Sequence, residues 1–177
     1  MELPRHLTTA RLRLREPRLS DASAIFEGYT QDPEVTKYLV WAPHQAISQT
    51  RAFLEQCVAG WEARVTLPYV LTLAAEDRAI GMLEARLRSH LVDVGYVLGR
   101  RHWGQGLMSE ALSELTSVCL SFPEVFRVQA TCDADNIASA RTLEKAGFRL
   151  EGRLERHTVH PNLSPYPRAC FMYARTR

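Results

Sequence analysis

The sequence has few cysteines and no excess of charge of one sign, and each shortage excludes a class of protein. Its 177 residues include 4 cysteines, none of them in a Cys-x-x-Cys pair, so we expect reduced thiols and no disulfides. The 22 basic and 20 acidic residues give a net charge of +2. That balance is not typical of a protein dedicated to nucleic acid or a membrane surface, and neither is expected as a partner.

Long hydrophobic runs are also missing. No stretch approaches the roughly 18 consecutive apolar residues of a membrane-spanning helix, and residues 1–6 lack the apolar core of a signal peptide. We therefore expect a cytoplasmic protein. The composition, with 46% hydrophobic and 24% charged residues, is ordinary for a globular protein, and the length fits one domain over residues 1–177.

Hydrophobic periodicity predicts both strands and helices. Strands are expected at 9–15, 69–75, 79–88, 91–98, 125–132, 148–156 and 171–175, and helices at 20–29, 48–62, from about 107 to Pro123, and at 136–146. A meander of strands followed by one strand-helix-strand crossover implies a mixed sheet in an α+β arrangement.

The most informative segment is the short loop between the strand at 91–98 and the helix after it. The loop contains Arg100, Arg101 and the pair Gly104-x-Gly106. Glycines allow a ligand to approach the backbone closely, and the first N–H groups of the following helix have no partners within the helix. Together with the helix dipole and the two arginines, this arrangement predicts a binding site for a phosphate or pyrophosphate.

Two common phosphate-binding motifs do not fit this loop. A Walker-type loop needs a lysine after its last glycine, whereas Leu107 and Met108 follow Gly106. A dinucleotide fold needs a third glycine, but Ser109 occupies that position, and five residues separate the strand from Gly104. A third interpretation is coenzyme A, and it rests on a family resemblance.

Two separated motifs support coenzyme A through a family resemblance. Arg101-x-x-Gly104-x-Gly106 resembles the pyrophosphate loop of the GNAT (Gcn-five-related) N-acetyltransferases, and Asn136-x-x-Ser139 resembles the helix that follows it in that superfamily. The sequence around the two glycines resembles that of the branch of ribosomal-protein N-terminal acetyltransferases. The resemblance covers nearly the whole chain.

The resemblance implies a GNAT fold, with a central, mostly antiparallel twisted sheet that splays in its middle and about four flanking helices. It also implies acetyl-CoA as cosubstrate, no metal, and homodimers as a frequent assembly. The residues expected to bind the coenzyme are Val97, Leu98, Arg100, Arg101, Gly104, Gln105, Gly106, Leu107, Met108, Asn136, Ser139 and Arg141.

The hairpin before the loop suggests the base that acyl transfer requires. If Ser89-His90 is a tight turn, Arg86 lies opposite Asp93 and Glu84 opposite Gly95, so the two acids share one face of the sheet. Asp93 occupies the position of an acid in the family's Glu-Ile-Gly-Tyr pattern, and Glu84 is the second candidate. The alternative is a cross-strand ion pair between Arg86 and Asp93.

The leaving thiolate needs a proton. Many relatives use a tyrosine seven residues after the helix asparagine, but that position here is Leu143. In the ribosomal branch the serine is thought to serve, which implies Ser139. Local roles are also open: Ser139 can bond the backbone, Asn136 can cap its helix, and Arg141 can pair with Glu144.

The predicted function is transfer of the acetyl group of acetyl-CoA directly to a primary amine. A protein N-terminus is the first expectation for the acceptor and a small amine the second. The former predicts an open groove beside the thioester and the latter a closed pocket. The alternative of a different class is a non-catalytic acyl-CoA sensor on the same fold.

Overall fold

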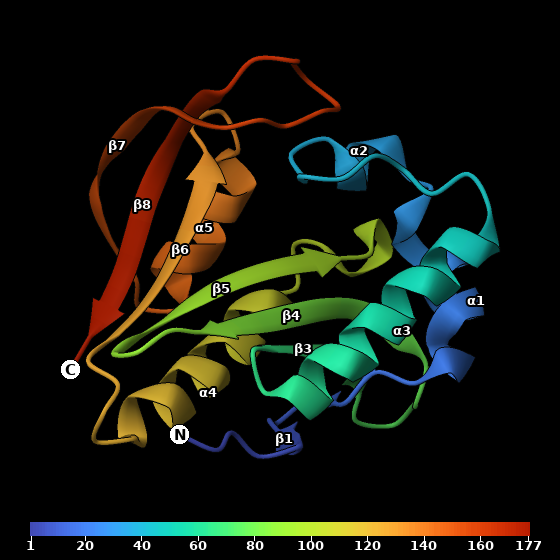
Figure 1. The fold of residues 1–177 in the computed structure, drawn as a ribbon, viewed down its shortest axis with the longest axis horizontal. Helices are drawn as coiled ribbons and strands as arrows, with labels where there is room; N and C mark the ends of the chain where they lie inside the picture. Colours follow the sequence, from blue (N-terminus) through green and yellow to red (C-terminus); the bar gives the residue numbers. More distant parts are fainter.

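A single sheet of eight strands crosses the computed structural model, which describes all 177 residues. In spatial order the strands are β1 (His6–Thr8), β2 (Leu12–Arg15), β3 (Thr66–Leu73), β4 (Ala79–Leu87), β5 (Leu91–Leu98), β6 (Arg127–Asp133), β8 (Arg168–Thr176) and β7 (Arg149–Thr158). All neighbours are antiparallel except β5 and β6, which are parallel (Figure 1). The predicted α+β class and mixed sheet are confirmed.

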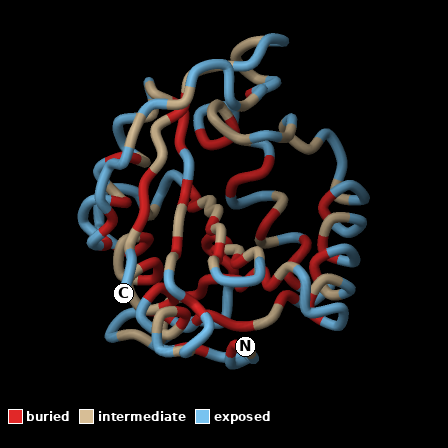
Figure 2. The backbone as a smooth tube through the Cα atoms, turned by 60° about the vertical axis from the view of Figure 1, so that its left-hand side comes forward, coloured by how far each residue is buried: buried red, intermediate tan, exposed pale blue.

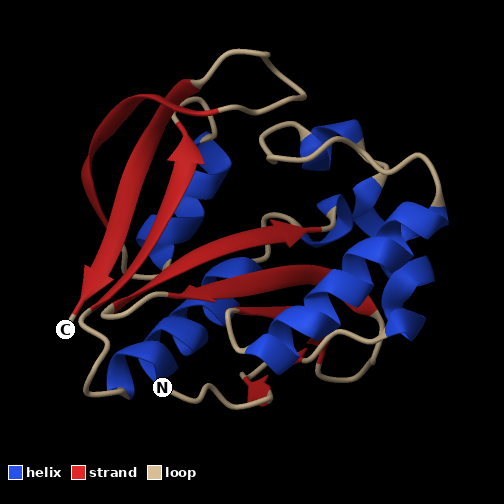
Figure 3. Ribbon diagram, viewed as in Figure 1, coloured by secondary structure: helices blue, strands red, loops and turns tan.

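Five α-helices flank the sheet, one more than expected. They are α1 (Ala22–Ile25), α2 (Pro33–Thr36), α3 (Ile47–Ala63), α4 (Leu107–Ser121) and α5 (Ile137–Lys145) (Figure 3). The unpredicted one is α2, which begins at a proline and is capped by Asp32, whose carboxylate accepts a hydrogen bond from the amide of Glu34. None of the five is long and apolar enough to cross a membrane.

The core has two parts, one on each face of the sheet, because side chains of a strand alternate between faces. The larger part packs α4 and α5 against the strands, with Leu112 and Leu115 fully buried. The smaller part packs α1 and α3 against β3 and β4 through Ile25, Leu54 and Val70. Figure 2 shows the buried segments between these layers.

The sheet forks between β5 and β6. The two strands pair only over Leu91–Asp93 and Arg127–Gln129, and beyond these residues they diverge (Figure 1). The half of the sheet from β1 to β5 and the half from β6 to β7 therefore enclose an opening. This is the splay that the resemblance implied.

The β4–β5 hairpin has the predicted register. Arg86 lies opposite Asp93 and Glu84 opposite Gly95, and the amide of Arg88 bonds the carbonyl of Leu91 at the tight turn. Directly opposed residues share a face of the sheet, so all of these residues lie on the face that α1 and α3 also cover.

The N-terminal elements differ from prediction. The strand expected at 9–15 is broken, because the Thr9 amide bonds the Leu12 carbonyl and makes a turn between β1 and β2. The helix expected at 20–29 is only α1, continued by a wide π-helical turn over Phe26–Thr30. Asp21 does not cap it with its side chain; its carboxylate instead pairs with the buried Arg15.

Candidate active site

A cavity of about 790 Å³ occupies the opening between β5 and β6. Its floor is formed by β4 and β5, one wall by the segment from α1 to the start of α3, and the other by the start of α5 and the end of β6. Glycines and first-turn residues of α4 complete one end. The cavity thus connects the predicted phosphate loop with the face that holds Glu84.

The edge of β5 that faces the cavity has free backbone groups. Antiparallel strands alternate between residues that bond the partner and residues that do not. The amide of Arg88 donates to the carbonyl of Leu91 and the amide of Gly99 to that of Ile80, so the polar groups of Val97 point to β4, while those of Tyr96 and Leu98 point away from it. The carbonyl of Leu98 accepts a hydrogen bond from the Trp103 indole at 2.7 Å, which leaves the backbone groups of Tyr96 and the amide of Leu98 unpaired. The backbone contact expected at Val97 and Leu98 stays a prediction.

The phosphate loop has the geometry that its glycines predicted. Gly104 and Gly106 have φ angles of 73° and 74°, in the left-handed region that glycine tolerates best. Gly106 directly precedes α4, whose first main-chain bond runs from the amide of Glu110 to the carbonyl of Gly106. The amides of Leu107, Met108 and Ser109 consequently lack helical partners and can receive an anion. The side chains of Leu107 and Met108 are buried, so only their backbone can bind.

A residue that sequence reasoning missed supports this loop. Arg11 donates to the carbonyl of Gln105 at 2.9 Å and to the carboxylate of Glu110. It thereby ties the loop and the first turn of α4 to the start of β2. Gln105 itself donates to the carbonyl of Arg101 at 3.1 Å and shapes the turn.

The two loop arginines have different surroundings. The guanidinium of Arg100 pairs with Asp32 at 2.8 Å, which joins the loop to the cap of α2. Arg101 is exposed and forms no ion pair. Of the two, Arg101 is the one that remains free for a phosphate.

The start of α5 reaches the cavity with hydroxyl groups. Asn136 caps the helix by accepting a hydrogen bond from the Ser139 amide at 3.1 Å. The Ser139 hydroxyl lies 2.7 Å from the hydroxyl of Tyr96. Burial raises the pKa of Tyr96, so both groups stay neutral at ordinary pH and can supply a proton. Tyr96 was not predicted as a site residue, although it belongs to the family pattern quoted above.

Two further residues of α5, Arg141 and Leu143, have different surroundings. Arg141 lines the cavity and does not pair with Glu144, whose carboxylate accepts a hydrogen bond from Tyr173 at 3.0 Å. Leu143, at the position of the usual tyrosine, is fully buried in the core. Ser139 is therefore the hydroxyl of this helix that faces Tyr96.

The two candidate bases are in different environments. Glu84 lines the cavity, with Arg86 at 3.5 Å. Asp93 lies outside the cavity lining and is held by Arg88 at 2.9 Å and Gln129 at 2.7 Å. The alternative pair between Arg86 and Asp93 is thus not formed. Asp93 joins β5 to β6 at the fork itself.

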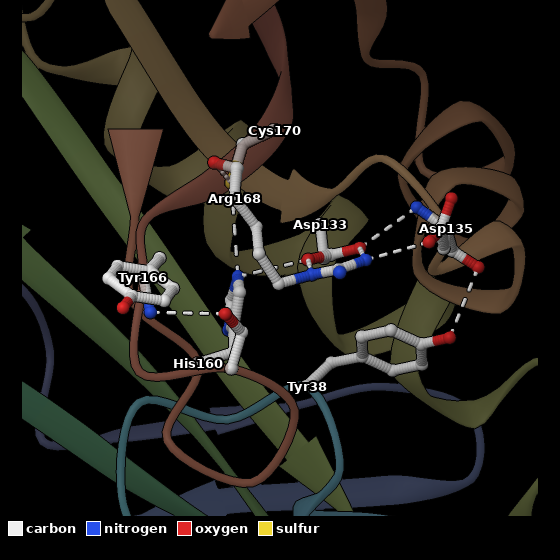
Figure 4. A network of polar contacts seen from close by, with 8 residues as sticks. Tyr38, Asp133, Asp135, His160, Tyr166, Arg168 and Cys170 are labelled. Atoms are coloured by element: carbon white, nitrogen blue, oxygen red, sulfur yellow. Dashed lines mark hydrogen bonds and ion pairs between the residues drawn. The ribbon is translucent and has the colours of Figure 1, made fainter. Parts of the chain in front are cut away.

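The far end of the cavity is closed by contacts between the two walls. Asn162 donates to the carbonyls of Thr36 and Trp41 at 2.7 and 2.9 Å, and Tyr38 donates to the carbonyl of Asp135 at 3.3 Å. Figure 4 shows Tyr38 reaching Asp135 beside the loop that follows β7. These contacts cover the acceptor side.

A buried ion pair stabilises that end of the site. Arg168 donates to both carboxylate oxygens of Asp133, at 2.6 and 3.1 Å, and to Asp135 at 2.7 Å (Figure 4). His160 lies 3.5 Å from Asp133, and its Nε2 is 3.9 Å from the sulfur of Cys170. His160 is therefore part of this network.

Comparison with known proteins decides the family. A model of the GNAT acetyltransferase domain matches residues 11–149. The chain belongs to the GNAT acetyltransferase family. A Bacillus licheniformis protein named as an uncharacterised N-acetyltransferase, p20, is 31% identical over 84% of both chains. The Bacillus subtilis N-acetyltransferase YoaA, also uncharacterised, is 31% identical over 90% of this chain and 91% of its own.

Solved structures share the fold over almost the full length. The microcin C7 self-immunity acetyltransferase MccE, solved with acetyl-CoA and AMP, has a TM-score of 0.87 at 21% identity and covers 99% of this chain and 98% of its own. RimL, a ribosomal L7/L12 α-N-protein acetyltransferase solved with coenzyme A, has a TM-score of 0.84 at 22% identity and 96% coverage of both chains.

Family membership confirms the predicted class of enzyme. The GNAT chain is an acetyl-CoA-dependent acyltransferase, as the loop and the Asn-x-x-Ser helix indicated. Tyr96, Arg11 and the closing contacts of the far end were missed. Tyr96 could have been found from the family pattern that contains it, whereas the partners of Arg11 and Asn162 lie up to 126 residues away in the sequence and no local pattern marks them.

Proposed function

We propose that this enzyme acetylates the nitrogen of a primary amine within a ternary complex. The observation that supports it most directly is one continuous cavity that joins an anion-binding loop, a free strand edge and a carboxylate. The amides at the start of α4 would hold the coenzyme pyrophosphate, with Arg101 beside them. The backbone groups of Tyr96 and the amide of Leu98 would bond the pantetheine arm. MccE and RimL were solved with acetyl-CoA and coenzyme A, respectively, which supports acetyl-CoA as the cosubstrate.

Glu84 is the base in this proposal. Its carboxylate lines the cavity and is about one-third exposed, so an ammonium can reach it directly or through a water molecule. Asp93 already has two partners, one of them a cation, and it does not reach the cavity. We assign Asp93 the structural role of holding the fork together.

The hydroxyl pair of Ser139 and Tyr96 is the proton source. In the reaction the amine nitrogen forms a bond to the acetyl carbon, the carbon–sulfur bond breaks, and the thiolate takes a proton from the pair. The ammonium gives one proton to Glu84 before the attack, and the nitrogen loses a second proton when the tetrahedral adduct collapses, which restores the proton that the pair gave to the thiolate. Two hydrogen-bonded hydroxyls favour this role because a proton can pass from one to the other along their hydrogen bond.

A covalent acetyl-cysteine route is disfavoured. Cys132 lines the cavity, but burial raises the pKa of its thiol to about 11. The thiolate is the nucleophilic form, and it is scarce at such a pKa. Direct attack by the amine needs no such group.

The closed far end favours a small amine as acceptor. Hydrogen bonds from Asn162 and Tyr38 bridge the walls where a polypeptide would have to pass. The other candidate acceptor, a protein N-terminus, is supported by the ribosomal-protein-serine acetyltransferase of Escherichia coli, which is 34% identical over 83 residues, 45% of this chain and 46% of its own.

A homodimer and a cytoplasmic location stay predictions. The four free cysteine thiols agree with a cytoplasmic location.

Calorimetry followed by a thiol-release assay tests this function. Acetyl-CoA should bind saturably, whereas NAD and ATP should not, and at least one amine of a broad panel should release free coenzyme A. Binding without release for any amine or peptide would favour the acyl-CoA sensor. No binding of acetyl-CoA would contradict the proposal altogether.

A further inference from the structure

Arg86 is an unusual arginine for its position inside the cavity. Its only charged neighbour is Glu84, at 3.5 Å, which is the longest arginine–carboxylate contact in the molecule. The other pairs, such as Arg88–Asp93 at 2.9 Å and Arg100–Asp32 at 2.8 Å, are close enough for direct hydrogen bonds. Arg86 forms no side-chain hydrogen bond within the protein and is 42% exposed.

The backbone leaves space for this guanidinium. It lies over Gly95, where a Cβ atom would approach the Arg86 Nη1 atom to 3.0 Å. A side chain at residue 95 would therefore crowd the guanidinium. The glycine exposes the positive charge on the floor of the cavity, beside the carboxylate of Glu84.

The coenzyme phosphates are too distant to use this charge. Gly95 and Leu98 are three residues apart on β5, which is about 10 Å of strand. The phosphate loop begins only beyond Leu98, and its anion site is at the start of α4. An anion that Arg86 binds must therefore come from the acceptor side.

We infer that Arg86 binds a carboxylate of the acceptor, and that the acceptor is a free α-amino acid. In such a molecule one carbon atom separates the ammonium nitrogen from the carboxylate carbon. Glu84 and Arg86 present opposite charges at a matching separation, so the ammonium would lie at Glu84 and the carboxylate at Arg86. The guanidinium can bind a carboxylate with two parallel hydrogen bonds. This inference rests on the proposed function.

The other cations of the acceptor end do not offer the same arrangement. Lys37 lies on the opposite wall, 5.4 Å from the ring centre of Tyr38. Arg168 is already bound to Asp133 and Asp135. Arg86 is the cation adjacent to the base.

The test compares α-amino acids with the matching amino-acid amides, which lack the carboxylate. The enzymes are the wild type, Arg86→Gln, Arg86→Lys and the control Arg51→Gln, which removes an equal charge from an exposed position of α3 outside the cavity. For the best amino acid, Arg86→Gln should raise KM about 10- to 100-fold, the loss of a charge-assisted hydrogen bond. KM for the amino-acid amide should not change in Arg86→Gln. Arg86→Lys should recover part of the lost affinity for the amino acid, and the control should have the KM values of the wild type.

The amino groups of amino acids and of their amides differ in basicity. Each acceptor is therefore compared between wild type and variant, so that this difference cancels. An equal loss of kcat for acid and amide in Arg86→Gln would overturn the inference, because it would show that the arginine stabilises the reacting carbonyl. Acetylation of peptides or simple amines but of no amino acid would also overturn it and leave the proposed function intact.

A binding measurement separates the two failures. Calorimetric titration of the amino acid into the complex with coenzyme A needs no turnover. If no amine is acetylated but the amino acid binds and Arg86→Gln abolishes that binding, the inference holds and the proposed function fails. Absence of both transfer and binding would overturn both.

Discussion

Glu84 and Asp93 lie on the same face of the sheet, two residues apart in cross-strand position, yet their chemistry differs. A carboxylate that already accepts hydrogen bonds from an arginine and a glutamine is oriented by these two partners. Asp93 is such a group. Glu84 has one loose neighbour and direct access to the cavity, so it can exchange a proton with a bound amine.

The substitutions Glu84→Gln and Asp93→Asn should therefore have opposite signatures. Glu84→Gln should lower kcat about 100- to 1000-fold with little change in stability, since a positioned base contributes about that much. Asp93→Asn should lower the free energy of unfolding by about 1–3 kcal/mol, because charged hydrogen bonds at the fork are weakened. Steady-state kinetics and urea unfolding of both variants separate the roles. A larger kcat loss in Asp93→Asn at equal folded fraction would contradict this assignment.

At the scale of single elements, the loop before α4 serves two different parts of the molecule. Arg101 is free beside the unpaired amides, whereas Arg100 holds the cap of α2 through Asp32. In the proposed complex the two adjacent arginines therefore differ in function: Arg101 would bind the coenzyme, whereas Arg100 supports the wall that contains α2.

Substituting each arginine by glutamine should separate these functions. Arg101→Gln should weaken coenzyme A binding about 3- to 10-fold at low salt, and the difference from wild type should shrink as salt screens the exposed charge. Arg100→Gln should leave coenzyme affinity unchanged and raise KM for the amine, because the wall is released. Calorimetry at two salt concentrations and acceptor kinetics measure these effects; a reversed pattern would show that Arg100 binds the phosphate.

The connection between β6 and β8 predicts a pH dependence of stability. Burial acts to raise the pKa of Asp133, but hydrogen bonds from Arg168 and from the amide of Asp135 outweigh it, so the pKa lies below its ordinary value of 3.8. A lowered folded-state pKa means stability that is present above about pH 4 and lost as the pH falls through the folded value.

Arg168→Met removes the cation and leaves a buried carboxylate. We expect the free energy of unfolding at pH 7 to fall by about 3 kcal/mol. In the wild type the free energy of unfolding decreases in acid. In Arg168→Met it should instead increase as the pH falls, because Asp133 without Arg168 prefers its neutral form. Urea unfolding from pH 8 down to about pH 2 measures both; the conservative Arg168→Lys should be intermediate. An unchanged pH profile would show that the pair is not coupled to stability.

Elements with local sequence signals could be predicted, and those that depend on distant partners could not. The β4–β5 register follows from a two-residue turn, and the phosphate loop from glycines before a helix. The choice between Glu84 and Asp93 depends on Gln129, which is 36 residues from Asp93. The brace from Arg11 to Glu110 spans 99 residues. Such pairs arise only when the sheet assembles, so a periodic pattern contains no trace of them.

For the whole molecule, the fork of the sheet creates the site and the far contacts close it. The two halves are joined at the fork by the Asp93–Gln129 hydrogen bond and at the opposite end by Asn162 and Tyr38. A direct transfer benefits from this enclosure, because water competes with the amine for the thioester. The strength of the contacts made by Asn162 and Tyr38 should then determine which sizes of acceptor can react and how fast water hydrolyses the thioester.

Asn162→Ala should open the acceptor end without affecting the coenzyme. It removes hydrogen bonds of 2.7 and 2.9 Å to the carbonyls of Thr36 and Trp41, each contributing about 1 kcal/mol. KM for a small amine should rise about 5- to 10-fold and thioester hydrolysis without amine should increase, while the affinity for coenzyme A stays constant. Ser164→Ala is the matched control, since its hydroxyl accepts a hydrogen bond only from the Tyr166 amide within the same loop. Peptide amines that react faster in Asn162→Ala than in wild type would show that closure limits acceptor size. Wild-type enzyme that prefers peptides, with Asn162→Ala unchanged, would show instead that these contacts yield to a protein N-terminus.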